Sequence, residues 1–596
     1  MPGLVGFAGK VLDIAEPKRV LQQMQDMITH EHSYVKDELF ADASVCSTRS
    51  HINLIQRERQ PYYKDGIYVW LDGEFCNRRE LQAACETPAK SDTEILHVLF
   101  RQSRDLSFLA DIDGYFCAAI YDTSTSKVHL ITDRYGLRRL YWTVCGSLLV
   151  WSSELKAMLA LPDFRPRIDP QAVTEFLNVG YLLENRTWFQ GVELLPSATV
   201  LTWDADKGTI DRHRYWWWDQ IKPFAGKIDE EQVVEELARL FIDAVERRSG
   251  QGERVGLTLS GGLDSRAILA AMPDRGYPVQ VVTYGQSGCD DIRIAAMAAQ
   301  VKGAVHRVVE LGPDNWLMPR IKGVWWTDGE LDLMHMHGIE AREVIKDAFD
   351  INLNGFAGDL ILGGSYLQAK TKARDNSQSI AAFMGCDPSL IERFDEYSSL
   401  RTLDFYFLQN RVRRFTYCGT RHFLTSIEQR KPFYDNRLIN FVYSLPDELR
   451  AHGRIYRLML LSTFPDYYRH IPWQKTGACI GTPRLVAKVL SGFRRVRDMA
   501  VRGAGHIGIR RHAHRPRAMV DYAIWIRAEP ARSFIDKILK NPDALYREYV
   551  QPQSVRDTWQ RHLNGEDLAS MVCRYLTFEI WLQQVFGGRY RPSADA

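Results

Sequence analysis

The chain has 596 residues, of which 45% are hydrophobic and 25% charged, and its formal net charge is +2. This length exceeds what a single hydrophobic core supports, so we expect two or more domains. The small net charge argues against a nucleic acid or a membrane surface as the main partner, and no apolar run reaches the ~18 residues of a transmembrane helix. The N-terminus lacks the basic and apolar regions of a signal peptide, and the cysteines show no zinc-type spacing. A cytoplasmic protein with reduced thiols is therefore expected.

The first two hundred residues contain short runs in which apolar and polar residues alternate. Such runs are typical of strands separated by turns, and they occur at 68–75, 115–122, 127–133 and 148–153. We therefore expect a strand-rich, layered domain over residues 1–214. The pattern breaks at 215–229, which we interpret as a linker. A helix is predicted at about 229–248, because its apolar residues fall on one face.

The pattern changes in the second half, which we treat as one domain over residues 230–596. An apolar strand at 254–260 runs directly into a helix. A second strand follows at 278–285, a helix at 290–303 and a third strand at 306–311. This alternation predicts a parallel sheet with helices on its faces, and the remainder of the chain is mostly helical by its pattern.

The sharpest motif is Ser260-Gly261-Gly262-Leu263-Asp264-Ser265, at the predicted strand-to-helix turn. Glycines let the backbone approach a phosphate closely, and a helix N-terminus supplies N–H donors. Ser260 and Ser265 add hydroxyl donors, and Asp264 can hold Mg²⁺. The loop resembles that of the N-type ATP pyrophosphatases, which implies ATP cleaved between its α and β phosphates. The alternative is a plain Gly-Ser turn that leads into a helix.

A second glycine-rich segment, NGFAGDLILGG at 354–364, extends the resemblance to the asparagine synthetase family, with its β-lactam synthetase and lasso-peptide cyclase relatives. The resemblance implies that Asp359 is a second magnesium-binding aspartate and that Gly355 lines the nucleotide. Two carboxylates from separate loops suit a magnesium-bound pyrophosphate leaving group. Two further segments, at 428–435 and 471–477, are similar to later motifs of the family.

The resemblance also implies two catalytic residues. Lys475 matches the family lysine that lies over the reacting carbonyl and the α-phosphate, where an ammonium can stabilise developing negative charge. An ordinary surface lysine is the alternative. Phe356 stands where relatives carry a glutamate or a tyrosine that handles the nucleophile, and phenylalanine cannot take a proton. Glu428, the partner carboxylate of that tyrosine, is retained. Whether Glu428 or an already neutral amine makes up for Phe356 stays open.

The N-terminal half departs from the family at its nucleophile. Family glutaminase domains begin Met-Cys-Gly, whereas Pro2 stands here in place of the cysteine. Other landmarks match the glutamine-binding segments, at Asp72, Gly73, Glu74 and Asp92. The resemblance therefore implies an Ntn-hydrolase-like α/β/β/α sandwich that has lost glutaminase activity. It also implies a following doubly wound parallel-sheet ATP-pyrophosphatase domain with helical additions.

The resulting prediction is a carbon–nitrogen ligase that uses ATP and Mg²⁺ to join a carboxylate to an amine through an acyl-adenylate. Asparagine synthesis, lasso-peptide cyclisation and another secondary-metabolite amide all stay open as the reaction, on a small molecule or a peptide, as does a homodimer. A nucleotide-binding pseudoenzyme is the alternative from another class, and the intact Asp264, Asp359 and Lys475 argue against it. The segment 491–517 has eight arginines against one aspartate, so it is either a solvated linker or a site for an acidic peptide or protein.

Overall fold

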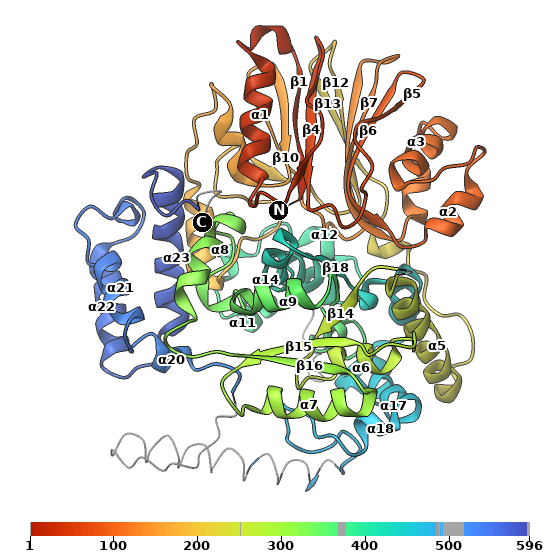
Figure 1. The fold of residues 1–596 in the computed structure, drawn as a ribbon, viewed down its shortest axis with the longest axis vertical. Helices are drawn as coiled ribbons and strands as arrows, with labels where there is room; N and C mark the ends of the chain where they lie inside the picture. The colour runs from red at the N-terminus through yellow and green to blue at the C-terminus, as the bar shows by residue number, and fades with distance from the viewer. Residues whose placement is uncertain are drawn as a thin grey trace.

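The computed structural model describes residues 2–250, 252–367, 377–483 and 518–592, with residues 485, 486, 489 and 492 between the last two ranges. The described chain forms two antiparallel sheets at one end of the molecule and a parallel sheet at the other (Figure 1). No helix in these ranges is long and apolar enough to span a bilayer. The predicted basic segment 491–517 lies outside the described residues, apart from Gly492.

The two antiparallel sheets lie face to face, and helices cover their outer faces (Figure 1). The first sheet has the order β11-β9-β10-β1-β4-β2, with β3 also on β4, and the second has the order β13-β12-β8-β7-β6-β5. The longer strands are β1 (Gly3–Gly9), β4 (Val45–His51), β10 (Leu148–Ser152), β6 (Ile67–Phe75), β7 (Gly114–Asp122), β8 (Lys127–Thr132), β12 (Thr199–Asp204) and β13 (Thr209–Arg214). The shorter strands are β2 (Val35–Lys36), β3 (Phe40–Ala41), β5 (Tyr62–Lys64), β9 (Tyr141–Cys145) and β11 (Glu193–Leu194). The covering helices include α1 (Pro17–Ile28), α2 (Arg78–Ala84) and α3 (Asp92–Gln102).

Strand β1 shows why this arrangement needs apolar residues on both faces. Leu4 and Ala8 pack between the two sheets, whereas Val5 and Phe7 point to the other side and pack with residues of α1. Successive residues of a strand point to opposite faces, so a strand in the middle layers is apolar throughout. The α/β/β/α sandwich predicted from the sequence is confirmed.

The parallel sheet has the order β16-β15-β14-β17-β18. Its strands are β14 (Val255–Thr258), β15 (Gln280–Gly285), β16 (Val305–Glu310), β17 (Ile351–Leu353) and β18 (Glu428–Arg430). Helices α5 (Glu230–Arg248), α6 (Asp264–Ala271) and α7 (Asp290–Lys302) accompany it. The chain runs outward from β14 to β16 and resumes at β17 on the other side of β14. The strand order therefore reverses between β14 and β17, which confirms the doubly wound sheet and marks the place where such sheets bind ligands.

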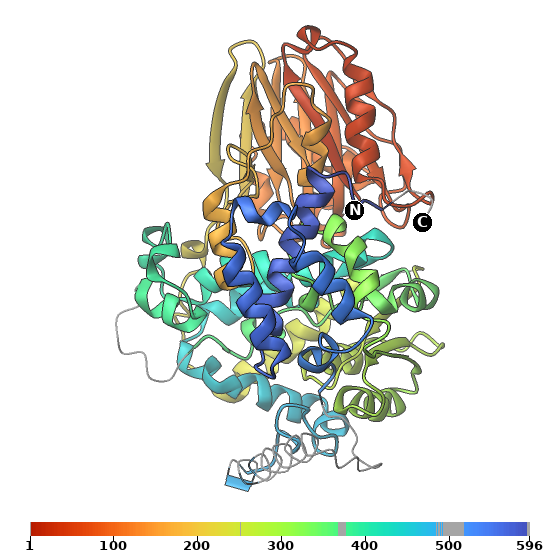
Figure 2. The same cartoon turned by 90° about the vertical axis from the view of Figure 1, so that its left-hand side faces the viewer.

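The C-terminal helices pack against both halves of the molecule (Figure 2). Helices α22 (Pro552–Leu563) and α23 (Ala569–Val585) share one core with β1, α1 and α4 (Pro170–Val179) of the sandwich and with α8 (Leu317–Trp326). Trp188 stacks on Phe578 of α23 with their ring centroids 5.3 Å apart. The first and last parts of the chain therefore build one hydrophobic core.

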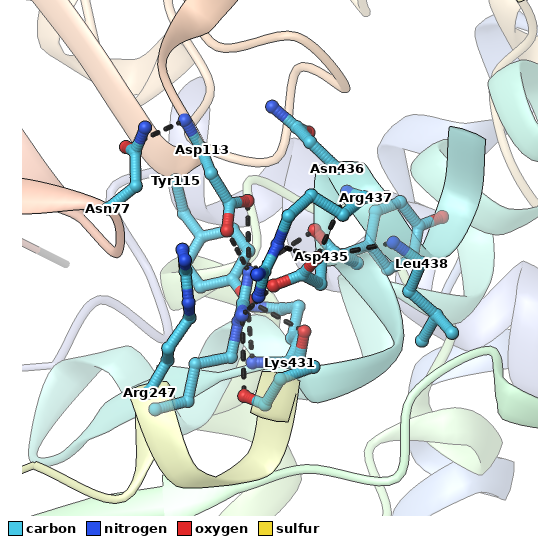
Figure 3. Close-up of polar contacts among 12 residues, drawn as sticks. Asn77, Asp113, Tyr115, Arg247, Lys431, Asp435, Asn436, Arg437 and Leu438 are labelled. Atoms are coloured by element: carbon cyan, nitrogen blue, oxygen red, sulfur yellow. Dashed lines mark hydrogen bonds and ion pairs between the residues drawn. The ribbon is translucent and has the colours of Figure 1, made fainter. Parts of the chain in front are cut away.

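A buried arginine at the end of α5, Arg248, ties the sandwich to the parallel-sheet region; Asp113, Tyr115 and Asp435, which surround it, are labelled in Figure 3. Arg248 donates to both carboxylate oxygens of Asp113 (2.9 and 2.8 Å), to Oδ2 of Asp435 (2.9 Å) and to the hydroxyl of Tyr115 (2.7 Å). Asp113 and Tyr115 belong to the sandwich, and Asp435 follows β18. Burial raises the pKa of Asp113 to about 6, against the attraction of the Arg248 charge. We call Arg248, Asp113, Tyr115 and Asp435 the interdomain cluster.

Residues 215–229, predicted as a linker, are anchored at their start. Trp216 and Trp218 are buried and pack edge to face, with ring centroids 5.0 Å apart. Trp218 also stacks on Phe405, with ring centroids 4.6 Å apart. The connection between the halves is therefore packed into the core at its first residues.

Candidate active site

A cavity of about 440 Å³ lies at the carboxyl ends of β14, β15 and β17. This is the point where the strand order reverses, so the cavity occupies the place where open α/β sheets bind ligands. Residues after β14 (Ser260 and Gly262 to Ser265) and after β17 (Asn354 to Ala357, and Asp359) line part of it. The two glycine-rich motifs, which are far apart in the sequence, thus meet at one cavity.

The first motif forms a tight loop between β14 and α6. The backbone N–H of Ser260 donates to Oγ of Ser265 (3.1 Å), and the two hydroxyl oxygens lie 3.0 Å apart. The N–H of Gly261 donates to Oδ1 of Asp291 (2.9 Å), and that of Gly262 donates to Oγ of Ser260 (3.2 Å). The loop is thereby held at the N-terminus of α6, whose free N–H groups and dipole favour an anion.

A buried arginine fastens this loop to the segment 467–472. Arg266, on α6, donates to the carbonyl oxygens of Gly261 (3.0 Å), Tyr467 (3.1 Å), Ile471 (3.2 Å) and Pro472 (3.1 Å). The side chain is fully buried. One guanidinium therefore sets the distance between the first motif and the segment that leads to Lys475.

Asp264 and Asp359 face each other across the two loops. The N–H of Asp359 donates to Oδ2 of Asp264 (2.9 Å), and the hydroxyl of Tyr456 donates to Oδ1 of Asp264 (2.8 Å). Burial and the neighbouring Asp359 charge raise the pKa of Asp264 to about 8. Burial of its carboxyl group also raises the pKa of Asp359, although part of this residue is exposed to solvent. Two carboxylates that disfavour each other's charge are stabilised when a cation binds between them.

The donors fit Mg²⁺ that arrives with a nucleotide. Magnesium in phosphate-binding sites uses one or two carboxylates, and phosphate oxygens and water supply the remaining ligands. In the described part of the chain, no cluster of three or more His, Cys, Asp or Glu side chains could hold a metal alone. Asp264 and Asp359 therefore fit a metal ion whose remaining ligands are phosphate oxygens and water.

Two glycines allow the second motif to approach the first. A Cβ added to Gly355 would lie 2.8 Å from the backbone N of Ser265. A Cβ added to Gly358 would lie 2.6 Å from Cγ of Asp264. Real side chains do not pack at these distances, so glycine at both positions is what lets the carboxylates meet.

Lys475 lies beside this site rather than in the cavity wall. It is exposed, and its Nζ sits 5.6 Å from the ring centroid of Trp473. Its charge acts to lower the pKa of Asp359, which places it near the carboxylate pair. The neighbouring Gln474 donates to Oδ2 of Asp291 (3.0 Å), the carboxylate that also holds Gly261.

The structure does not bring Glu428 to the cavity. Glu428 is buried on β18 at the junction of the two halves, where it pairs with Arg138. Arg138 also lies 3.4 Å from Oδ2 of Asp72. Burial raises the pKa of Glu428, while the Arg138 charge opposes that shift. The motif that contains Glu428 and Asp435 thus supplies interdomain ion pairs, and this use could not be read from the sequence.

In the sandwich, side chains at positions predicted to match a glutamine site are engaged by other residues of the chain. Glu74 receives two hydrogen bonds of 2.8 Å from Arg430. Asp92 accepts from the N–H of Phe75 (2.9 Å) and from Nε of Arg78 (2.6 Å). A Cβ added to Gly73 would lie 1.9 Å from the carbonyl oxygen of Tyr115.

No thiol near the start of β1 is suited to replace the missing nucleophile. Pro2 is buried just before β1, and the thiol of Cys117 lies 3.8 Å from Oγ of Ser153, which accepts a hydrogen bond from the N–H of Leu4 (2.9 Å). Burial raises the pKa of Cys117 well above its usual value, so this thiol stays protonated.

Sequence reasoning missed the remaining part of the cavity wall. This part includes Tyr284 of β15, His335 and His337 between β16 and β17, Phe415 and Thr416 at the end of the π-helix η8 (Leu408–Thr416), and Phe423 after that helix. Neither histidine lies in a repeating pattern, and His335 belongs to a three-residue helix, η5 (Leu333–His335). The long π-helix, a feature frequent at functional sites, marks this region in the structure, but it could not be read from the sequence.

Comparison with known proteins finds a matching family model in each half of the chain. Residues 1–216 match the family model of the glutamine amidotransferase domain. Residues 236–418 match that of asparagine synthase.

Relatives match over most of the chain. The glutamine-hydrolyzing asparagine synthetase 2 of Bacillus subtilis (strain 168) is 23% identical over 535 residues, which cover 79% of this chain and 71% of that protein. Asparagine synthetase 3 of the same organism is 25% identical over 544 residues, covering 80% and 87%. A solved structure, glutamine phosphoribosylpyrophosphate amidotransferase from B. subtilis complexed with ADP and GMP, covers 53% of this chain and 82% of that chain, at 13% identity and a TM-score of 0.26. That likeness is too weak to bear on the fold.

Proposed function

The chain belongs to the asparagine synthetase family, and from this premise we propose that it activates a carboxylate as an acyl-adenylate and passes the acyl group to an amine. The observation that carries the proposal is the carboxylate pair Asp264 and Asp359, held together beside a phosphate-type loop at the switch point of the sheet. ATP would be cleaved between its α and β phosphates, and AMP and pyrophosphate would be the products.

In this proposal the loop residues bind and orient the nucleotide. The backbone of Ser260 to Ser265, at the N-terminus of α6, would hold the phosphates, and Gly355 would let the nucleotide lie against the second loop. Asp264 and Asp359 would hold Mg²⁺, which neutralises charge on the departing pyrophosphate when bound. Tyr456 would keep Asp264 in position through its hydrogen bond. Lys475 would stabilise the negative charge that develops on the acyl and phosphate oxygens.

We further propose that the sandwich no longer hydrolyses glutamine and serves as a scaffold. Pro2 carries no nucleophile, and Glu74 and Asp92 are engaged with arginines of the chain itself. All ten cysteines are unpaired, which supports a cytoplasmic location. Peptide cyclisation and other amide products remain predictions, as do a homodimer and binding of an acidic partner at 491–517.

The nucleotide products test the proposal. With MgATP, ammonium and a carboxylate (L-aspartate first, then acidic peptides), the protein should release AMP and pyrophosphate in step with amide formation. Asp264→Asn and Asp359→Asn should each lower the rate by orders of magnitude, because each removes a charge that holds the metal. Asp274→Asn, an exposed carboxylate beyond the far end of α6, is the matched control and should behave as wild type.

Three outcomes would contradict the proposal. ADP as the stoichiometric product would exclude adenylation. Unaltered product formation in both Asp264→Asn and Asp359→Asn would show that the carboxylate pair does not hold a catalytic metal. Nucleotide binding without turnover on any carboxylate would favour the pseudoenzyme.

A further inference from the structure

A histidine that is held by a buried carboxylate faces the cavity. Asp332 is fully buried and caps the short helix η5, where it accepts a hydrogen bond from the N–H of His335 (3.1 Å). Its two carboxylate oxygens lie 2.8 and 2.9 Å from Nδ1 of His335. The His335 ring meets Phe415 edge to face, with centroids 4.7 Å apart, so its plane is fixed on two sides.

This arrangement determines which ring nitrogen can accept a proton. A carboxylate beside Nδ1 keeps the proton on that atom, and Nε2 is left with its lone pair. In the ranges that the structure describes, no hydrogen-bond partner is found for Nε2, and 28% of the side chain is exposed. His335 therefore presents a proton acceptor to the cavity.

The other titratable groups of the cavity wall are either engaged by other residues or unsuited to accept a proton from an amine. Asp264 and Asp359 face each other as the proposed metal ligands, and Asp291 accepts from Gly261 and Gln474. Burial raises the pKa of Tyr284 and lowers that of His337 well below its usual value. His337 also has its Nδ1 3.2 Å from the hydroxyl of Tyr522.

The second glycine-rich motif presents an apolar side chain, Phe356, to the cavity. Phe356 lines the cavity, stacks on Tyr434 with centroids 5.3 Å apart and meets Tyr417 edge to face. Glu428 lies away from the cavity in its ion pair with Arg138. An amine that attacks an acyl carbon must lose a proton, so the reaction requires an acceptor that neither residue supplies.

We propose that Nε2 of His335 is this acceptor, and this rests on the function proposed above. The amine nitrogen forms a bond to the acyl carbon, and the bond between that carbon and the adenylate oxygen breaks. AMP leaves with the electron pair of the broken bond, and the proton of the amine passes to Nε2 of His335. Asp332 stabilises the imidazolium that results. The amine consequently binds at the wall formed by His335, Phe415 and Thr416.

His335→Gln tests the assignment with two nucleophiles. With ammonium as the amine, the variant should form amide about 10²- to 10⁴-fold more slowly, the range for loss of a general base. With hydroxylamine, whose adduct is acidic enough to lose its proton to water, hydroxamate formation should stay close to wild type. Carboxylate-dependent exchange of labelled pyrophosphate into ATP should also stay close to wild type, because it precedes the amine.

Control variants separate chemistry from structure. Asp332→Asn should slow the ammonium reaction in the same way, because an amide can hold the ring in the other tautomer. His337→Gln, from the same wall, should affect ammonium and hydroxylamine alike. An unchanged ammonium rate in His335→Gln, or an equal loss with both nucleophiles, would overturn the assignment. Absence of pyrophosphate exchange in the wild type would instead contradict the proposed function.

Discussion

At the scale of single residues, replacing Lys475 should have a different effect on the kinetics from replacing Asp264 or Asp359. It lies outside the cavity wall, near enough to Asp359 to affect the pKa of that carboxyl. We expect Lys475→Met to lower the rate of amide formation at saturating ATP by about 10²- to 10³-fold, because its charge acts on the transition state. The KM for ATP should change little.

Steady-state kinetics with varied ATP decide this prediction. Lys475→Arg, which keeps the charge, is the matched variant and should retain part of the rate. If the affinity for ATP collapses in Lys475→Met while the rate at saturating ATP is normal, the lysine binds nucleotide and has no part in the chemistry.

Single residues also show what the sequence could and could not predict at the site. The motif Ser260 to Ser265 was placed at a strand-to-helix turn, and the structure has it there, because a glycine-rich turn between an apolar run and a helix is a local signal. That Asp359 would meet Asp264 followed only from resemblance, since the contact joins distant segments. His335 was missed because its role depends on Asp332 and on a cavity that only the fold creates.

At the scale of elements, the three longer strands of the parallel sheet and helix α5 follow the predictions closely. Strands β14, β15 and β16 overlap the predicted runs, and α5 spans Glu230–Arg248. Strands β17 and β18 were not predicted, because three residues are too few to show a period. Yet β17 completes the switch point, so the shortest elements of the sheet define where the cavity lies.

Arg266, which links α6 to the segment 467–472, can be tested by substitution. Replacing Arg266 with Met would remove its hydrogen bonds to four carbonyl oxygens, and those of Tyr467 and Ile471 are buried. We expect Arg266→Met to lower the free energy of unfolding by at least about 3 kcal/mol, since unsatisfied buried polar groups are costly. The KM for ATP should rise, because Gly261 is no longer tied to Pro472.

Urea denaturation and ATP kinetics would measure both effects. Arg254→Met is the control, since Arg254 is more than half exposed and pairs with Asp350 at the surface. Its loss should change the unfolding free energy by less than about 1 kcal/mol. Equal stability of the two variants would show that the Arg266 contacts do not stabilise the loop.

At the scale of the whole molecule, the interdomain cluster makes the stability of each half depend on the other. Arg248→Met would remove the buried counter-charge that Asp113 and Asp435 share, and Asp435 would keep only the partly exposed Arg437. We expect a loss of roughly 3–5 kcal/mol in the free energy of unfolding, the range for a broken buried ion pair. The adjacent Arg247→Met removes a pair with the largely exposed Glu80, so its cost should be below about 1 kcal/mol.

Calorimetry of both variants provides the measurement. The wild type and Arg247→Met should unfold at similar temperatures, and Arg248→Met well below them. An Arg248→Met protein as stable as Arg247→Met would mean that the Arg248 contacts do not help to hold the halves together.

The core shared by the two ends of the chain constrains how the protein is made. Phe7 of β1, Trp188 and Trp581 of α23 belong to the same buried cluster. Many proteins complete their first domain while the ribosome is still making the next, but here α23 follows the whole parallel-sheet region in the chain. The nascent sandwich therefore leaves the ribosome with part of its apolar surface uncovered, and this core is completed only when α23 arrives.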